Sequence, residues 1–272
     1  METPPIAQAP TSCWIVGAGM LGRALAARLR TQGVRVLTLD LLPGADVVGD
    51  AADGAVLVQA CARLMPQVVY CCQATHGGGV DAYRRAYIDV VAQLYATLPR
   101  VRVVLCSSTS VYGKVSHLVT ESTEPVAPTE RAAVLLAAES QVLSRGGVVG
   151  RLAPLYGSSR CEVLRRHLTG EPMLPGADDR MLNYVHVDDA VDALLLLSSA
   201  ECGIYNVSGE SYVKSELYRM LREVCGAPGS EVSAPGSERG VSDRRVDSSR
   251  LRGLGWQPLM SLREFAQSSI NT

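Results

Sequence analysis

A glycine-rich turn near the beginning of the chain carries the strongest chemical signal. Residues 14–22 read Trp-Ile-Val-Gly-Ala-Gly-Met-Leu-Gly, an apolar run that leads into three spaced glycines. The first glycine permits a tight turn, the second lets the backbone approach a diphosphate, and the third lets a helix pack closely on a strand. The helix that follows adds free amides and the positive end of its dipole. The residues expected to contact a dinucleotide pyrophosphate are Gly17, Gly19, Met20, Leu21 and Gly22.

An acidic residue follows at the spacing that such a site needs. Asp40 closes the second apolar run, 18 residues after Gly22. A carboxylate there accepts hydrogen bonds from ribose hydroxyls and repels a 2′-phosphate, so it favours NAD over NADP. Arg23 and Arg35 are cations close to Asp40 in the fold we expect, and they keep NADP possible.

Strand and helix patterns alternate along the first 155 residues. Strands are expected at 13–16, 34–39, 67–72, 101–106 and 147–152, and helices at 22–32, 55–64, 80–97 and 129–144. Apolar strands of this kind are buried on both faces, and strand–helix alternation produces right-handed crossovers. The expected class is therefore α/β, a Rossmann-type doubly wound parallel sheet with a small C-terminal substrate lobe.

The domain division follows from where this alternation loosens. We expect a disordered leader over 1–12, an NAD(P)-binding domain over 13–155 and a mixed substrate lobe over 156–272, with 183–207 returning to the sheet. Further helices are expected at 160–169, 188–198 and 213–225, and a mobile loop at 226–240, which is rich in Gly, Pro and Ser.

Composition excludes several classes of protein. The formal net charge is −1, which argues against nucleic-acid partners and anionic membrane surfaces, and no apolar run approaches the roughly 20 residues of a membrane span. The N-terminal residues contain no basic segment of the signal-peptide type. The eight cysteines lie mostly in apolar runs without metal-ligand spacing, so we expect core thiols, no metal and a cytoplasmic location.

Five further segments, in order, resemble one family. They are Ser107–Gly113 (SSTSVYG), Val148–Gly157 (VVGRLAPLYG), Asn183–Asp189 (NYVHVDD), Gly203–Gly209 (GIYNVSG) and Ser249–Pro258 (SRLRGLGWQP). With the glycine turn, they resemble the extended short-chain dehydrogenases, the NAD-dependent epimerase/dehydratase family. The turn reads GxGxxG where that family usually has GxxGxxG, which indicates an atypical branch.

The resemblance implies roles for individual residues. Ser108 matches the family's catalytic serine, which hydrogen-bonds the reacting oxygen, and Asp50 matches an acid that contacts adenine. Two loops complete the implied cofactor site, one along the ribose and one beside the nicotinamide. Their residues are Gln73, Ala74, Thr75, Ala153, Pro154 and Leu155.

The chain departs from the family at its catalytic pair. The family has Tyr-x-x-x-Lys on a helix, with a glutamate eight residues after the tyrosine. Glu139 matches that glutamate, which places Arg131 at the tyrosine and Leu135 at the lysine. The phenol passes a proton to or from the substrate oxygen, and the ammonium lowers the phenol's pKa and binds the nicotinamide ribose. Leucine does neither, whereas arginine can stabilise an oxyanion or bind a carboxylate.

Three side chains are candidates to replace the missing groups, each with a plainer alternative. Tyr112 is a displaced acid or a structural residue, and Arg131 is a ligand for a substrate anion or a surface cation. His76 lies in the glycine-rich loop 75–79, which borders the cofactor cleft in this fold, and an imidazole titrates near neutral pH.

Three functions remain open on this sequence. The first is an NAD(P)-dependent reductase or dehydrogenase of a small polar carbonyl or imine, in which Ser108 polarises the substrate. The second is a nucleotide-sugar epimerase or dehydratase, and the third is a non-catalytic dinucleotide-binding sensor or scaffold. The helix over 131–143 contains an unbroken apolar run, and the family pairs this helix across a dimer, so we expect a homodimer.

Overall fold

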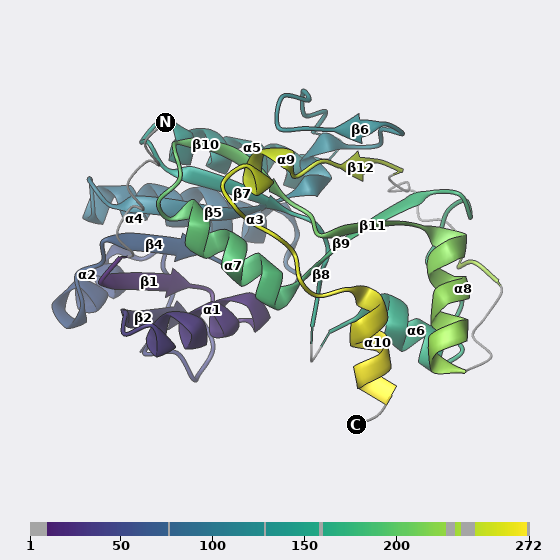
Figure 1. Cartoon of the computed structure of the whole chain (residues 1–272). Helices are drawn as coiled ribbons and strands as arrows, with labels where there is room; N and C mark the ends of the chain where they lie inside the picture. Colours follow the sequence, from purple (N-terminus) through teal and green to yellow (C-terminus); the bar gives the residue numbers. More distant parts are fainter. Residues whose placement is uncertain are drawn as a thin grey trace, which may run out of the picture. The chain divides into compact units, whose positions relative to one another are not determined.

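The computed structural model describes residues 10–75, 77–127, 129–157, 160–226, 232–234 and 243–270. The chain folds into two compact units, which are described separately (Figure 1). The first unit comprises Met1–Ser108, Thr129–Arg151 and Val191–Tyr205, and the second comprises Thr109–Pro128, Leu152–Ala190 and Asn206–Thr272.

The first unit is built on a seven-stranded sheet with the strand order β10-β7-β5-β4-β1-β2-β3 (Figure 1). The strands are β1 (Ser12–Val16), β2 (Arg35–Asp40), β3 (Val47–Val48), β4 (Val68–Cys71), β5 (Arg102–Ser108), β7 (Val148–Leu152) and β10 (Gly203–Val207). The pairings of β1 with β2 and β4, of β2 with β3 and of β4 with β5 are parallel. The chain moves outward from β1 through β3 and then crosses back to β4, so the strand order reverses between β1 and β4. In doubly wound sheets ligands bind beyond the carboxyl ends of the strands at such a point.

Helices cover both faces of this sheet, which confirms the expected fold class. A salt bridge of 2.5 Å between Arg28 and Asp192 joins α1 to α7, whereas α4 contacts both α2 and α5. The helices are α1 (Met20–Thr31), α2 (Gly54–Arg63), α3 (Gly79–Tyr83), α4 (Val90–Thr97), α5 (Glu130–Leu143) and α7 (Val187–Leu197). Strands β1, β4 and β7 are buried along their whole length, as the apolar runs predicted.

The expected long helix over 80–97 contains a change of helix type. Residues Arg84–Asp89 form a π-helix, η1, between α3 and α4. A π-helical turn holds an additional residue, which rotates the side chains before it relative to those after it, and such turns occur often at functional sites. The apolar periodicity of the sequence does not reveal this change.

The second unit has a hydrophobic core of its own, which includes Tyr156, Leu164, Tyr184, Leu217 and Phe265. A three-stranded sheet has the order β11-β9-β8, and β12 pairs in parallel with β6. The strands are β6 (Leu118–Val119), β8 (Leu155–Tyr156), β9 (Met181–His186), β11 (Glu210–Val213) and β12 (Arg245–Val246). The helices are α6 (Glu162–Leu168), α8 (Lys214–Cys225), α9 (Ser249–Arg252) and α10 (Leu262–Ile270), and η2 (Thr109–Tyr112) is a 3-10 turn.

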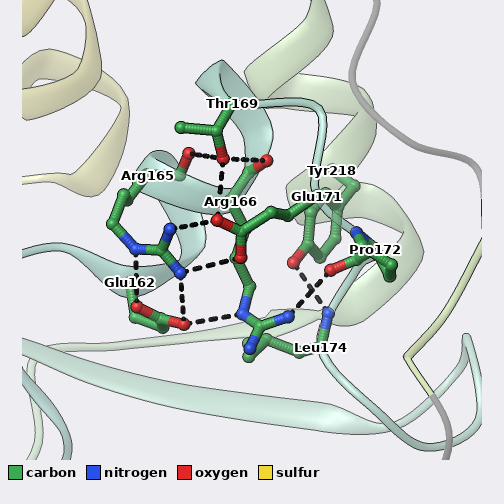
Figure 2. A network of polar contacts seen from close by, with 8 residues as sticks. All are labelled: Glu162, Arg165, Arg166, Thr169, Glu171, Pro172, Leu174 and Tyr218. Carbon is green, nitrogen blue, oxygen red and sulfur yellow. Dashed lines mark hydrogen bonds and ion pairs between the residues drawn. The ribbon is translucent and has the colours of Figure 1, made fainter.

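A polar network fixes the turn that follows α6 in the second unit (Figure 2). Arg165 bridges Glu162 and Glu171, and the neighbouring Arg166 donates to both Glu162 and the Pro172 carbonyl. The hydroxyl of Tyr218, from α8, accepts the Leu174 amide at 2.9 Å. These contacts connect the two helices around the turn.

Two expected assignments differ from the observed ones, and parts of two other expected segments lie outside the described residues. Of the range 183–207, β10 joins the seven-stranded sheet, but β9 pairs with β8 and β11 instead, because its edges are taken by those strands. Ser12, placed in the leader, is the first residue of β1 and hydrogen-bonds the Met65 carbonyl. Most of the loop expected at 226–240 and residues 1–9 of the leader lie outside the described residues.

Candidate functional site

The glycine turn joins β1 to α1 at the point where the strand order reverses. Gly17 has a φ of +93°, which a side chain rarely tolerates, and a Cβ placed on it would lie 2.4 Å from the Gln73 amide nitrogen. A Cβ on Gly22 would lie 1.9 Å from the Gly17 carbonyl oxygen. Both glycines are therefore required by close packing, one against the end of β4 and the other between helix and turn.

Gly19 differs from the other two glycines of the turn, because no atom lies within 4 Å of the position that a Cβ on it would occupy. It is exposed and forms the N-cap of α1 in an extended conformation. In the described part of the chain no side chain caps this helix, and its first turn has no acidic residue. The first amides of a helix need hydrogen-bond partners, and the positive end of the dipole favours an anion. The open space, the uncapped amides and the dipole fit a pyrophosphate beside Gly19, Met20 and Leu21.

Asp40 lies at the carboxyl end of β2, next to this turn. Its Oδ2 accepts the Ala18 amide at 2.5 Å, and its Oδ1 accepts the Leu42 amide at 2.9 Å. The carboxylate therefore fixes the turn, and each oxygen retains a second lone pair for a ribose hydroxyl.

Arg23 and Arg35, the two cations that kept NADP possible, lie at different ends of the site's elements. Arg23 donates from Nε to the Ala18 carbonyl at 2.7 Å, so it lies at the turn. Arg35 is the first residue of β2 and Asp40 is the last, so five residue steps of strand, about 16 Å, separate them. The expectation that Arg35 lies near the ribose is wrong, because a strand places its two ends at opposite edges of the sheet.

Asp50, the residue implied to contact adenine, follows β3 and forms an ion pair. Its Oδ2 lies 2.5 Å from Nε of Arg85 in η1, and its Oδ1 accepts the Ala52 amide at 2.8 Å. Hydrogen bonding and proximity to Asp50 raise the pKa of Arg85 above its usual value. The carboxylate is thus oriented by η1, and its contact with adenine remains a prediction.

The loop after β4 is also attached to η1. The Gln73 side-chain amide donates to the Ala86 carbonyl at 2.7 Å, and the Tyr87 hydroxyl donates to the Gln73 carbonyl at 3.1 Å. The Gln73 backbone, rather than its side chain, is the part that packs against Gly17. Ala74 is exposed and Thr75 is half-buried, and their place along the ribose stays a prediction, while His76 lies outside the described residues.

The two serines at the end of β5 have different surroundings. Ser107 is buried and donates to Glu139 Oε1 at 2.5 Å, and Glu139 forms a buried ion pair of 2.6 Å with Arg151. The glutamate on α5 thereby fixes this helix to β5 and β7. Ser108, half-buried, comes next in the strand. Successive strand side chains face opposite sides, so Ser108 is directed away from that network.

Arg131, at the position expected for the missing tyrosine, stacks on an aromatic ring. Its guanidinium carbon lies 5.1 Å from the ring centroid of Tyr83 in α3. Arg131 is half-buried, and its role as a ligand for a substrate anion stays a prediction. Leu135, one turn further along α5, is buried with 4% of its surface exposed and packs in the core.

The remaining candidate residues belong to the second unit. Tyr112 is completely buried, and its hydroxyl donates to Asn206 Oδ1 at 2.8 Å, which opposes the idea of a displaced acid and favours its structural alternative. Pro154 accepts the Val185 amide and Leu155 begins β8, while Ala153 donates to the Val207 carbonyl. Their contact with the nicotinamide stays a prediction.

Within the described ranges, both a metal-binding cluster and a membrane-spanning helix are absent. No group of three or more His, Cys, Asp or Glu side chains there is placed to bind a metal ion. None of the helices in those ranges combines the length and hydropathy needed to cross a bilayer.

Sequence reasoning missed three side chains of the site, all from the α3–η1 segment: Tyr83, Arg85 and Tyr87. The two tyrosine rings lie 5.3 Å apart, at the i, i+4 spacing of a helix face. That spacing was visible in the sequence, but the partners of these side chains were not, because they come from residues 50, 73 and 131.

The fold and this turn together define a dinucleotide-binding protein of the Rossmann type. The family model of the NAD dependent epimerase/dehydratase family matches residues 13–208. The chain belongs to this family, as the resemblance predicted. NAD as the expected cofactor is confirmed at the level of the family.

Similar proteins include a GDP-L-fucose synthase and two UDP-glucose 4-epimerases. A putative GDP-L-fucose synthase 2 of Oryza sativa subsp. japonica is 35% identical over 101 residues, which cover 36% of this chain and 29% of that protein. The match therefore spans less than a third of the curated relative's length.

Two UDP-glucose 4-epimerase structures share the fold. The one from Thermotoga maritima, with UDP-glucose, has a TM-score of 0.80 at 18% identity, covering 96% of this chain and 97% of that one. The one from Thermus thermophilus, with NAD, has a TM-score of 0.79 at 21% identity, covering 96% and 98%.

Proposed function

We propose that this protein binds NAD and uses it to epimerise or dehydrate a nucleotide-linked sugar. The single observation that carries the proposal is the open, uncapped beginning of α1 beside Asp40, at the reversal of strand order. Membership of an NAD-dependent family supports the cofactor. The rice GDP-L-fucose synthase and the two UDP-glucose 4-epimerases support the substrate class.

The residues around the turn account for the choice of cofactor. The amides at the beginning of α1 bind the pyrophosphate, and the negative Asp40 accepts ribose hydroxyls and repels a 2′-phosphate. Leu41 and Leu42, exposed after Asp40, offer no charge to a 2′-phosphate. Arg23 remains as a cation at the turn, but its Nε is engaged with Ala18. NAD is therefore the preferred form.

The chemistry takes place on the side of β5 and α5. When bound, NAD accepts or returns a hydride at a sugar carbon. Ser108 hydrogen-bonds the sugar oxygen at that carbon, and the positive charge of Arg131 favours negative charge that develops near it during the proton transfer. Glu139, buried with Ser107 and Arg151, keeps α5 in place relative to β5.

The nucleotide-sugar reaction is favoured over the reduction of a small carbonyl or imine. None of the relatives described above is named for the latter reaction, whereas all three are named for chemistry on nucleotide sugars. We place substrate selection in the second unit, as the sequence suggested. A homodimer through α5 and a cytoplasmic location are part of the proposal, and the eight cysteines, all described and all free thiols, support the location.

The experiment has two stages. Calorimetric titration with NAD, NADH and NADPH comes first, with Asp40→Asn as the matched variant that keeps an oxygen for Ala18 but loses the charge. We expect NAD to bind and NADPH to gain affinity in the variant. GDP-, UDP- and dTDP-sugars are then incubated with the NAD-loaded protein and the products are identified by NMR. Ser108→Ala should lower turnover by about 100-fold or more.

The outcomes separate the three functions. Conversion of a nucleotide sugar supports the proposal, and turnover of small carbonyls or imines alone would replace it with the reductase. NAD binding without turnover on any substrate would favour the non-catalytic sensor. If neither NAD nor NADPH binds, the assignment of the glycine turn is wrong.

A further inference from the structure

We propose that Tyr83 supplies the catalytic phenol that Arg131 displaced, and that Arg131 is its positioning residue. The inference rests on the proposed function, because it assigns the group that moves the substrate proton in that reaction. It begins from the stacking of the Arg131 guanidinium on the Tyr83 ring at 5.1 Å. Since Arg131 occupies the position where the family resemblance expects a tyrosine, Tyr83 brings a phenol to within one side chain of that position.

Among the described tyrosines, Tyr83 combines a hydroxyl without a hydrogen bond with a half-buried side chain, whereas Tyr70 and Tyr95, whose hydroxyls also have no partner, are buried. The hydroxyls of Tyr87, Tyr112 and Tyr156 are all used within the protein, by Gln73, Asn206 and Met260. Tyr70 and Tyr95 are buried, and burial raises the pKa of both phenols. Among the described residues no hydrogen bond to the Tyr83 hydroxyl is found, and Tyr83 is half-buried. Its ring is thus held between Arg131 and Tyr87, while its hydroxyl has no hydrogen bond within the described residues.

The α3–η1 segment, which holds the Tyr83 ring, also contacts residues of the proposed cofactor site. The Tyr83 ring lies 5.3 Å from that of Tyr87, whose hydroxyl is attached to the Gln73 carbonyl beside Gly17. The π-helix η1 begins directly after Tyr83 and directs Arg85 to Asp50. One short segment therefore contacts the adenine-side acid, the loop after β4 and Arg131. π-Helical turns occur often at functional sites.

The proposed reaction combines one proton transfer with one hydride transfer. In the oxidising direction the Tyr83 phenolate oxygen takes the proton of the sugar hydroxyl, so one O–H bond breaks and one forms. The electron pair of the C–H bond leaves as hydride to NAD, and the carbon becomes a carbonyl. A guanidinium on the ring face attracts the electron-rich ring, and the attraction grows when that ring carries negative charge. Arg131 would thereby replace the lysine that buried Leu135 cannot supply.

The first test needs neither cofactor nor substrate. An aryl sulfonyl fluoride modifies phenols that ionise readily, and peptide mass spectrometry locates the modified residues. Tyr212, half-buried with its hydroxyl donated to Glu210, is an internal reference. We expect Tyr83 to be modified at least 5-fold faster than Tyr212, and this advantage to disappear in Arg131→Leu and to return in part in Arg131→Lys. Equal rates at the two tyrosines, or no effect of Arg131→Leu, would overturn the proposal.

The second test measures turnover of the nucleotide sugar that the wild type converts. Tyr83→Phe keeps the ring and its stacking, so its thermal unfolding and its calorimetric affinity for NAD should match the wild type. Its kcat should fall at least 100-fold with little change in KM. Wild-type kcat in Tyr83→Phe would overturn the inference and leave the proposed function intact. Absence of turnover in the wild type would overturn the proposed function, whereas the labelling experiment still decides on the Tyr83–Arg131 pair.

Discussion

The helices α1 and α5 begin in opposite ways within the same unit. Helix α1 begins at Gly19, with no side-chain cap and no acid in its first turn in the described structure. Helix α5 begins after Thr129, whose hydroxyl accepts the Ala132 amide at 3.2 Å, and Glu130 follows at its positive end. A helix in water gains stability from such a cap and such an acid. The uncapped beginning of α1 therefore indicates a site for an anion, and α5 serves as a fixed support for side chains.

The largest effect is expected where α5 is fixed to the sheet. Glu139→Ala leaves Arg151 buried and removes the acceptor of Ser107. Loss of one partner of a buried ion pair should cost about 3–5 kcal/mol of unfolding free energy. Urea denaturation measures this loss of unfolding free energy, and Glu130→Ala, an exposed position on the same helix, is the control. A cost below 1 kcal/mol would show that α5 is fixed by its apolar contacts alone.

The next effect concerns the packing of α1 on its turn. Gly22→Ala brings a Cβ against the Gly17 carbonyl, so either the helix or the turn must shift. We expect a loss of about 1–3 kcal/mol in unfolding free energy together with weaker NAD binding. Thermal unfolding and calorimetry of the same sample measure both. An unchanged NAD affinity would mean that the turn does not need close contact with α1.

A smaller effect separates the two helix beginnings. Thr129→Ala removes the cap of α5 and should cost about 1 kcal/mol in unfolding free energy without changing NAD affinity. Thr129→Ser keeps a hydroxyl and is the matched control. If Thr129→Ala weakened NAD binding as strongly as Gly22→Ala, the distinction between a binding helix and a supporting helix would fail.

The smallest effect is a pH dependence in the second unit. His167 of α6 is buried, and burial, with a contribution from Arg222, lowers its pKa below the usual value. As pH falls through the unfolded-state pKa near 6.5, the unfolded chain takes up a proton that the folded state does not, so stability decreases. His167→Leu should make the unfolding free energy less dependent on pH between 7.5 and 5.5. An unchanged slope in this variant would show that His167 is not responsible.

The sequence predicted those parts of the molecule that depend on local pattern. The strands β1, β2, β4, β5 and β7, the three glycines and Asp40 all follow from patterns along the chain. Strand direction alone would have excluded Arg35, since it begins β2 and Asp40 ends it. Contacts between helices could not be predicted in this way. The stacking of Arg131 on Tyr83 joins residues 48 positions apart, and nothing in the apolar periodicity of 80–97 indicates the π-helix that positions that ring.

The most direct test of the account is the affinity of NAD for two variants at Gly19. Space is open at its Cβ and its φ is −74°, so Gly19→Glu and Gly19→Gln should both unfold at the wild-type temperature. The two side chains are matched in size, but only glutamate brings a negative charge to the pyrophosphate site. We predict that calorimetry will show weaker NAD binding in Gly19→Gln and a further loss of at least about 10-fold in Gly19→Glu. NAD binding at wild-type strength in Gly19→Glu would contradict the assignment of this helix beginning as the cofactor site.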